Sequence, residues 1–359
     1  MAALKKALTG KNIGAGLMYF YVHFAMEVLC YFCLKRQAGP ASFLWLFPLA
    51  YDVLAFVPQA LAGYINDRFP RFNAALYGTL AMCAAAGCFA LGVFSNRFIP
   101  LVILCAGNAL THVGGAEVTL RSSGGHLASP AIFVAGGAFG VISGTMLAKT
   151  SLPYGAVILF MLTALPFIIR AEKYKSPEKS AAVLCRGFDY ASEKVSPSLV
   201  ILLSCVTVAL RSYMGFCLPL AWKTTALHAV LLYVAMGVGK AAGGIFADAF
   251  GVKKTAIFSA AASLPFILLG NRIMLVSLIG ILLFSMTMSV SLALIVSVLR
   301  NAPGLSFGYT TIALTAGVLP IFFFNISSYA VNSVILSAFT ALCLAAMAVI
   351  IRKDVKRVD

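Results

Sequence analysis

Long apolar stretches alternate with short polar segments along the whole chain. A helix needs about 20 apolar residues to cross the hydrocarbon core of a bilayer, and twelve stretches are of roughly that length. Polar residues do not recur at every second position within them, so we exclude the strands of an outer-membrane barrel. The pattern predicts an all-α integral membrane protein with twelve transmembrane helices. The predicted spans are 12–34, 42–64, 73–94, 99–120, 129–149, 151–169, 197–221, 225–247, 254–270, 273–299, 305–326 and 328–351.

Composition supports a membrane protein and shows no sign of an enzyme. Hydrophobic residues make up 61% of the chain and charged residues 11%, whereas about a quarter of the residues of a soluble domain are charged. The short connections leave no room for the soluble nucleotide-binding domain of an ATP-driven pump. The chain also has no His-Glu-x-x-His motif and no Gly-Lys-Ser/Thr phosphate loop. We therefore expect no catalytic residue, no bound metal and no cofactor.

The basic residues lie mostly on one side of the predicted membrane. The net charge is +16, and 19 bases fall in segments on the side of the N-terminus against six on the other side. This bias follows the positive-inside rule and places both termini in the cytoplasm. The basicity therefore needs no nucleic-acid partner. We expect a multi-pass protein of the cytoplasmic (plasma or inner) membrane, monomeric, with the lipid bilayer and a small-molecule substrate as its partners.

Two copies of one motif divide the chain into similar halves. Gly-x-x-x-Asp followed by bases occurs at 63–71 and again at 244–254, and the two aspartates are 181 residues apart in a chain of 359. Leu-Arg pairs that end the fourth and tenth spans repeat at nearly the same offset. The predicted organisation is an N-terminal six-helix bundle (1–170), a polar cytoplasmic linker (171–196) and a C-terminal six-helix bundle (197–359). Two related halves are typical of membrane transporters.

The repeated motif resembles the one that follows spans two and eight in the major facilitator superfamily, Gly-x-x-x-Asp-Arg-x-Gly-Arg-Lys. The first copy shares Gly63, Asp67, Arg68 and Arg71 with it, and Pro70 replaces the second glycine. The second copy shares Gly244, Asp248, Gly251 and Lys253, and Ala249 replaces the arginine. The resemblance covers the whole chain. It implies a pseudo-symmetric fold of six plus six helices that transports a solute by alternating access.

The charged groups of this motif are candidates for a gate on the cytoplasmic side. An aspartate cannot face lipid, so Asp67 should find a base or a helix N-terminus. Glu117 and Arg121 are four residues apart at the end of the fourth span, in the favourable order for a helical ion pair. We expect one network that opens when the protein faces inward; the alternative is a static network at the lipid headgroups. The gating candidates are Gly63, Asp67, Arg68, Arg71, Glu117, Arg121, Lys240, Gly244, Asp248, Gly251, Lys253 and Lys254.

The first span carries a polar stripe. Tyr19, His23, Glu27 and Tyr31 are spaced by four residues and so share one helical face. This face should point into the bundle. Glu27 is the best candidate for a proton carrier, because a carboxyl group away from water can bind and release a proton near neutral pH; a structural hydrogen bond to a neighbouring helix is the alternative. Asp52 in the second span either carries a proton, contacts substrate or pairs with a base.

Arg211 near the middle of the seventh span needs an anionic partner, because arginine stays charged in proteins. That partner is either a protein carboxylate or an acidic group of the substrate. The seventh span is the repeat partner of the first, so we expect Arg211 and Glu27 to face each other across a cavity. His112 is either functional or a hydrogen-bonded core histidine. The candidates for substrate binding or proton coupling are Tyr19, His23, Glu27, Asp52, His112, Arg211 and Tyr213.

Glycines in the fifth span predict close helix packing. Gly136, Gly140 and Gly144 recur every four residues and form a small-residue ridge. Antiporters of the superfamily have a Gly-Pro-x-x-Gly element in this span; here Gly140 and Gly144 match it, but Val141 replaces the proline. Exporter status therefore stays open. The run Arg-Ser-Tyr at 211–213, with Gly107 and His112 in the fourth span, is similar to fosmidomycin-resistance-type exporters.

These features predict a secondary active transporter that moves a small organic solute by alternating access. Arg211 favours an anionic solute, and Glu27 or Asp52 favours coupling to the proton gradient. The alternatives on the same fold are a drug or metabolite efflux antiporter and a lysolipid flippase. A membrane receptor or enzyme that does not transport is a further alternative of a different class.

Overall fold

The structure is a computed structural model that describes residues 10–37, 46–69, 71–174, 185, 187–218, 220–324 and 328–352. Apart from one short 3-10 helix, η2 (Glu172–Tyr174), the regular elements of these residues are α-helices. The helices are α2 (Gly10–Gln37), α3 (Leu46–Phe56), α4 (Gln59–Arg68), α5 (Ala74–Leu91), α6 (Phe98–Ser122), α7 (Ala128–Leu147), α8 (Tyr154–Leu162), α9 (Leu165–Ala171), α10 (Pro197–Cys217), α11 (Ala226–Phe250), α12 (Val252–Leu269), α13 (Met274–Ser285), α14 (Met288–Val298), α15 (Pro303–Val318), α16 (Pro320–Phe323) and α17 (Tyr329–Ile350).

Twelve segments of the described chain are long and apolar enough to cross a membrane. The predicted all-α fold with twelve spans is confirmed, and the protein is a multi-pass membrane protein. The span ends differ by a few residues. The second span was predicted as 42–64, whereas the helix continues to Arg68, and residues 42–45 and Pro70 lie outside the described part. The first motif copy is therefore mostly the last turns of α4.

Four of the spans consist of two helices joined by a short break: α3 with α4, α8 with α9, α13 with α14, and α15 with α16. Proline explains three of the breaks, because it lacks an N–H group and clashes with the preceding turn. Pro58 precedes α4, and Pro166 and Pro320 occupy the first turns of α9 and α16. The break between α13 and α14 at Met286 and Thr287 contains no proline.

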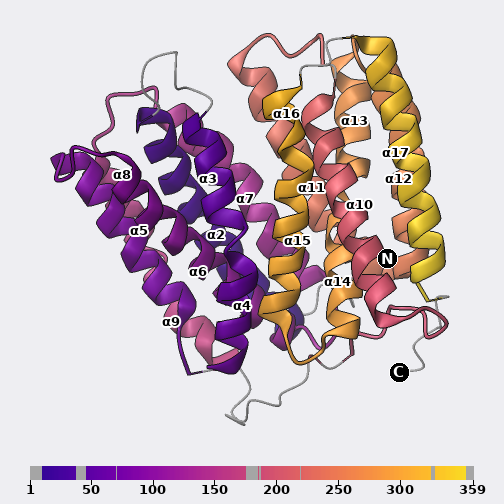
Figure 1. Cartoon of the computed structure of the whole chain (residues 1–359), viewed down its shortest axis with the longest axis horizontal. Coiled ribbons are helices and arrows are strands. Elements are labelled where there is room, and N and C mark those ends of the chain that lie inside the picture. Colours follow the sequence, from indigo (N-terminus) through magenta and orange to yellow (C-terminus); the bar gives the residue numbers. More distant parts are fainter. Residues whose placement is uncertain are drawn as a thin grey trace.

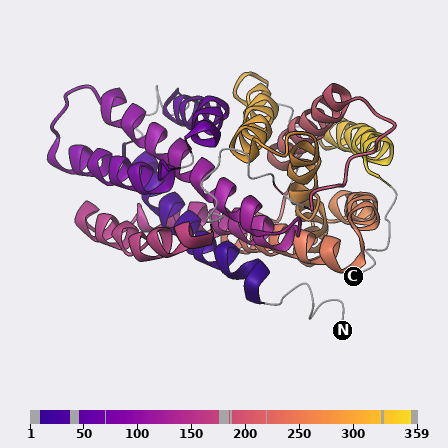
Figure 2. The ribbon, with the colours of Figure 1, turned by 90° about the horizontal axis from the view of Figure 1, so that it is seen from below.

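The helices form two bundles that lie side by side, with α2 to α9 in one half and α10 to α17 in the other (Figure 1). The view from below shows the same division (Figure 2). The halves meet mainly where α7 packs on α11 and where α4 packs on α15. These two contacts correspond under the duplication, because α4 and α11 carry the two motif copies and α7 and α15 are the fifth and eleventh spans.

The glycine ridge of α7 lies against α2, the most extensive helix contact of the N-terminal half. A Cβ atom at Gly140 would lie 2.5 Å from the Phe24 carbonyl oxygen, and one at Gly144 would lie 2.5 Å from that of Val28. Gly136 approaches the Phe20 carbonyl in the same way. The absence of side chains at these positions lets the two backbones come close, and this fixes the polar face of α2 against α6 and α7.

The described part of the linker joins both halves at one end of the molecule, which we call the linker end. The backbone N–H of Cys185 donates to the Arg300 carbonyl at 2.8 Å. Asp189 accepts from Arg300 at 3.2 Å and from Arg352 at 2.6 Å, and the Tyr190 hydroxyl contacts the Gly125 carbonyl of the N-terminal half. Residues 175–184 and 186 of the predicted linker lie outside the described residues. The cytoplasmic orientation of this end stays a prediction.

Candidate functional site

Asp67 at the end of α4 caps a helix of the opposite half. Its carboxylate accepts from the backbone N–H groups of Gly304 at 3.0 Å and Leu305 at 2.9 Å, in the first turn of α15. The free N–H groups and the dipole of a helix N-terminus both favour a negative charge there. Gly63 allows α4 to come this close to the start of α15, because a Cβ atom at this position would lie only 2.7 Å from the Leu305 nitrogen.

Asp248 near the end of α11 repeats this arrangement in the other direction. It accepts from the N–H groups of Leu127 and Ala128, both at 2.8 Å, at the start of α7. Gly244 packs against Leu127 and Ala131. Each half therefore caps one helix of the other half at the linker end, and these two contacts join the halves there.

Side-chain charges surround the first cap. Arg121 on α6 lies 3.8 Å from Asp67 and donates to Glu117 at 3.0 Å. Asn66 donates to the other oxygen of Glu117 at 2.7 Å. His126 lies 3.7 Å from Asp248 at the second cap. The structure thus brings Asp67, Glu117 and Arg121 together, as the sequence predicts, and gives Asp67 both a base and a helix N-terminus.

Two other basic residues of the motif, Arg68 and Lys253, contact their own half. The Arg68 guanidinium lies over the Tyr64 ring at 4.6 Å, and Arg71 is exposed. Lys253 donates to the carbonyl groups of Ala348 at 2.8 Å and Ile351 at 3.2 Å, at the end of α17. Gly251 has a φ of 100° between α11 and α12, a conformation that favours glycine. Lys254 follows in the first turn of α12.

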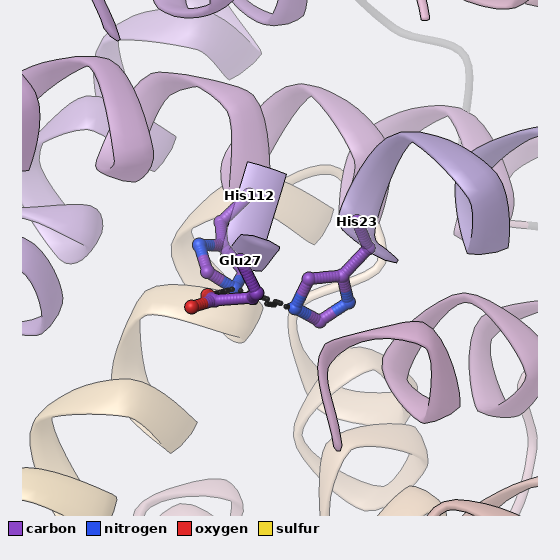
Figure 3. A group of neighbouring side chains, drawn as sticks. All are labelled: His23, Glu27 and His112. Carbon is purple, nitrogen blue, oxygen red and sulfur yellow. Dashed lines mark hydrogen bonds and ion pairs between the residues drawn. The ribbon is translucent and has the colours of Figure 1, made fainter. Parts of the chain in front are cut away.

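A second group, which we call the central cluster, consists of His23 and Glu27 on α2 and His112 on α6. The three side chains point toward one another (Figure 3). The Nε2 atoms of the two histidines are 3.0 Å apart. The Glu27 Oε1 atom lies 3.8 Å from His23 Nε2 and 3.6 Å from His112 Nε2. All three residues are buried.

Asn108, one turn before His112 on α6, holds the cluster together. Its side-chain oxygen lies 2.9 Å from His112 Nδ1, and its amide nitrogen lies 3.4 Å from Glu27 Oε1 and 3.1 Å from the Tyr51 hydroxyl. The sequence analysis missed Asn108, although its spacing of four residues from His112 places both on one helical face. Tyr19 lies outside the central cluster, one turn before His23 on α2, with its ring edge-on to Phe133.

Lys240 on α11 is the charged group that the opposite half brings to the central cluster. Its charge interacts with Glu27, His23 and His112. The sequence predicts a gate contact for Lys240, because it shares a helix face with Asp248. Two helical turns separate the two residues. The gate contact of Lys240 stays a prediction, and its position near the central cluster is a second feature that the sequence does not predict.

Arg211 does not face Glu27 as the sequence predicts. Its Nη2 atom donates to the Phe284 carbonyl at 3.0 Å, and its guanidinium lies 5.0 Å from the centre of the Phe284 ring. Because the helix is interrupted between α13 and α14, the Phe284 carbonyl is available to accept a hydrogen bond from outside the helix. Arg211 therefore binds this carbonyl oxygen rather than the anion that the sequence predicts. No sequence signal marks this break, since it has no proline. Tyr213 lies on the same helix with its ring 5.7 Å from Phe339.

Asp52 on α3 lies where the two halves face each other. Its carboxyl group lies near Lys35 and Tyr31 on α2 and near Tyr233 on α11. The structure therefore brings Asp52, Glu27 and Lys240 to the interface between the halves, and it leaves Arg211 inside the C-terminal half.

The arrangement of twelve spans in two bundles is similar to the fold of solved transporters, one of which is named as a member of the major facilitator superfamily. The human organic anion transporter MFSD10 (TETRAN) aligns with a TM-score of 0.65 and 15% identity, over 94% of this chain and 99% of that one. A variant of the E. coli fucose:proton symporter FucP aligns with a TM-score of 0.64 and 12% identity, over 94% and 99%. FucP in the outward conformation aligns with a TM-score of 0.57 and 13% identity, over 93% and 99%. No protein-family model matches the chain, and no curated protein matches it in sequence.

Proposed function

We propose that this protein is a secondary active transporter that moves a small organic solute across the membrane by alternating access. The observation that carries the proposal is the pair of reciprocal caps, in which Asp67 and Asp248 each bind the N-terminus of a helix in the opposite half. Such contacts hold the halves together at the linker end. Breaking them lets that end open while the other end closes.

The interface between the halves supplies the chemistry for a solute and a coupling ion. Glu27 and Asp52 are carboxyl groups within membrane spans, where an ionisable group marks a substrate or ion pathway by default. Lys240 adds a positive charge from the other half. We propose protons as the coupling ion, as the sequence predicts, and an acidic group on the solute as the partner of Lys240. The fold relatives include an organic anion transporter and a proton symporter, which supports both parts.

The first experiment tests the caps with one cysteine reporter at each end, a native one at the linker end and an introduced one at the other. Cys185 is fully buried in the linker beside Asp67, Glu117 and Arg121, so its alkylation reports opening of the linker end. A Tyr31→Cys substitution reports the other end of α2. Removing the charge with Asp67→Asn or Asp248→Asn should cost each cap about 0.5–2 kcal/mol. We expect about 2- to 30-fold faster labelling of Cys185 and slower labelling at position 31, read by mass spectrometry of the two peptides.

The control is Glu193→Gln, which removes an exposed acid of the same linker. Glu193 contacts only Arg352 among the described residues, at 3.2 Å, and an exposed ion pair contributes little. Labelling at both ends that is unchanged by the cap variants, or that rises at both ends together, contradicts alternating access. A ligand found by a thermal-shift screen should then show counterflow in proteoliposomes, since only a transporter exchanges it across a sealed bilayer.

A further inference from the structure

The ligand atoms of the central cluster have the spacing of a metal site. One nitrogen or oxygen from each of His23, Glu27 and His112 lies within 4.8 Å of the others. Their separations are 3.0, 3.6 and 3.8 Å. A tetrahedral zinc ion with bonds of about 2.0–2.1 Å keeps its ligands about 3.3–3.4 Å apart. Small side-chain movements would therefore bring all three atoms to one ion.

The hydrogen bonds of the two histidines direct both Nε2 lone pairs toward each other. His23 Nδ1 faces the Phe133 carbonyl at 2.9 Å. His112 Nδ1 faces two oxygens of Asn108, at 2.9 and 3.2 Å. These oxygens only accept, so both Nδ1 atoms must carry hydrogen, and in neutral rings both Nε2 atoms then lack it. Two lone pairs 3.0 Å apart repel unless a cation lies between them.

Glu27 adds a second, independent sign of an absent ligand. The residue is 3% exposed, and its Oε2 atom is buried with no hydrogen-bond partner at normal distance among the described residues, although the Tyr51 hydroxyl is near enough to act on the carboxyl group. Leaving a polar atom of this kind unpaired away from water is costly. An ion bound by the carboxylate would satisfy this atom and the two imidazoles at once, whereas a proton shared by the histidines would leave Oε2 unpaired.

We propose that His23, Glu27 and His112 bind a divalent transition-metal ion of the zinc class. Imidazole nitrogen with a carboxylate suits zinc and its neighbours better than calcium or magnesium, which prefer oxygen ligands alone. Three protein ligands leave a tetrahedral ion one open position, available to water or to an acidic group of the solute. Binding of the ion does not depend on transport, and an ion on Glu27 would leave Asp52 as the carboxyl group that carries the coupling proton. The sequence predicts no metal site, because the two histidines lie 89 residues apart and only the packing of α2 on α6 unites them.

Three neighbours affect the site: two favour metal binding and one opposes it. Asn108 and the Phe133 carbonyl orient the imidazoles, the role that hydrogen-bond partners of metal ligands usually have. Lys240 opposes a dication, since its charge acts on all three ligands. Replacing it with the uncharged Lys240→Met should therefore strengthen metal binding, an effect that damage to the fold cannot imitate.

The test titrates the purified full-length protein in detergent with Co²⁺ and follows its visible absorption, with Zn²⁺ as competitor. We expect one tetrahedral Co²⁺ per chain, displaced by Zn²⁺. His23→Ala, His112→Ala and Glu27→Gln should each weaken binding by at least about 100-fold, Asn108→Ala by about 10- to 100-fold, and Lys240→Met should tighten it severalfold. His228→Ala is the matched control, because His228 lies at the start of α11 beside Trp222 and Thr224, away from the cluster.

Three outcomes would overturn the metal site. They are no Co²⁺ binding, binding that survives in His23→Ala and His112→Ala, and a sulfur-to-cobalt charge-transfer band showing that the cysteines bind instead. None of these touches the caps, so the transport proposal would stand. Conversely, labelling rates that do not change in Asp67→Asn and Asp248→Asn would contradict the alternating-access proposal and leave the metal-site proposal standing.

Discussion

At the scale of single residues, one glycine sets the position of a histidine. A Cβ atom at Gly137 on α7 would collide with the His23 ring, at 2.6 Å from Cε1 and closer still to Nε2. The ring occupies the space where a side chain of α7 would be. This explains why His23 can reach both the Phe133 carbonyl and His112, and why Gly137 differs from the neighbouring glycines, which contact the α2 backbone.

Gly137→Ala should therefore move the His23 imidazole out of the central cluster. Overpacking of this kind typically costs about 1–3 kcal/mol of stability, and the displaced ring should also lose Co²⁺ binding. The measurements are thermal unfolding and the cobalt titration. Gly87→Ala is the control, because Gly87 is also inside a helix but has no atom within 4 Å of its would-be Cβ. That substitution should stabilise the helix by about 0.5–1 kcal/mol. Normal Co²⁺ binding by Gly137→Ala would show that the ring position does not depend on this glycine.

At the scale of elements, the linker behaves as a docked segment rather than a free tether. Cys185, Asp189 and Tyr190 contact the ends of helices from both halves. Burial raises the pKa of the Cys185 thiol to about 12, an effect that nearby Arg121 opposes and Asp67 and Glu117 reinforce. The thiolate is the form that reacts with alkylating reagents, so a docked linker keeps this cysteine unreactive.

The alkylation rate of Cys185 should accordingly be slow at pH 7 and still be rising with pH above 9, because the raised pKa keeps the thiol protonated there. In denaturant the midpoint should fall to the ordinary value of about 8.5. Asp189→Ala, which removes the carboxylate that binds Arg300 and Arg352, should speed the reaction at pH 7 by loosening the linker. Cys88, for which a fixed linker contact is absent among the described residues, serves as the internal reference. A Cys185 midpoint near 8.5 in the native protein would refute docking.

At the scale of the whole molecule, the two caps stabilise one closed state from opposite directions. Asp67 binds α15 and Asp248 binds α7, and duplication makes the two contacts equivalent. They share no atoms, so their contributions to the closed state should add, as for independent sites.

The double variant Asp67→Asn/Asp248→Asn should thus raise Cys185 labelling by the product of the two single effects. Labelling rates of the four proteins under identical conditions provide the measurement, with a thermal-unfolding scan to verify that all are folded. A double variant no faster than the faster single variant would mean that one cap alone holds the linker end.

Much of this architecture could be predicted from the sequence, because hydropathy and charge act along the chain. The twelve spans and the two halves follow from run lengths and from the repeated Gly-x-x-x-Asp. For Asp67 the sequence predicts only the type of partner, a base or a helix N-terminus, because the helix N-terminus that it binds lies 237 residues away and leaves no local signal. The contact between His23 and His112 depends on the orientation of α2 about its own axis relative to α6, which the sequence does not determine. The predicted position of Arg211 was wrong, because a helix break that contains no proline provides a backbone oxygen as its partner instead of an anion.

The partners of Asp67 and Asp248 are main-chain amides, and this limits which second-site mutations can compensate for the loss of a cap. An ion pair between two side chains can be restored by exchanging both residues, whereas a peptide N–H is present whatever residue occupies the position. Suppressors of a defective Asp67 should therefore not arise as reciprocal replacements at Gly304 or Leu305. Revertants would instead have to restore the acid itself or strengthen another contact between the halves.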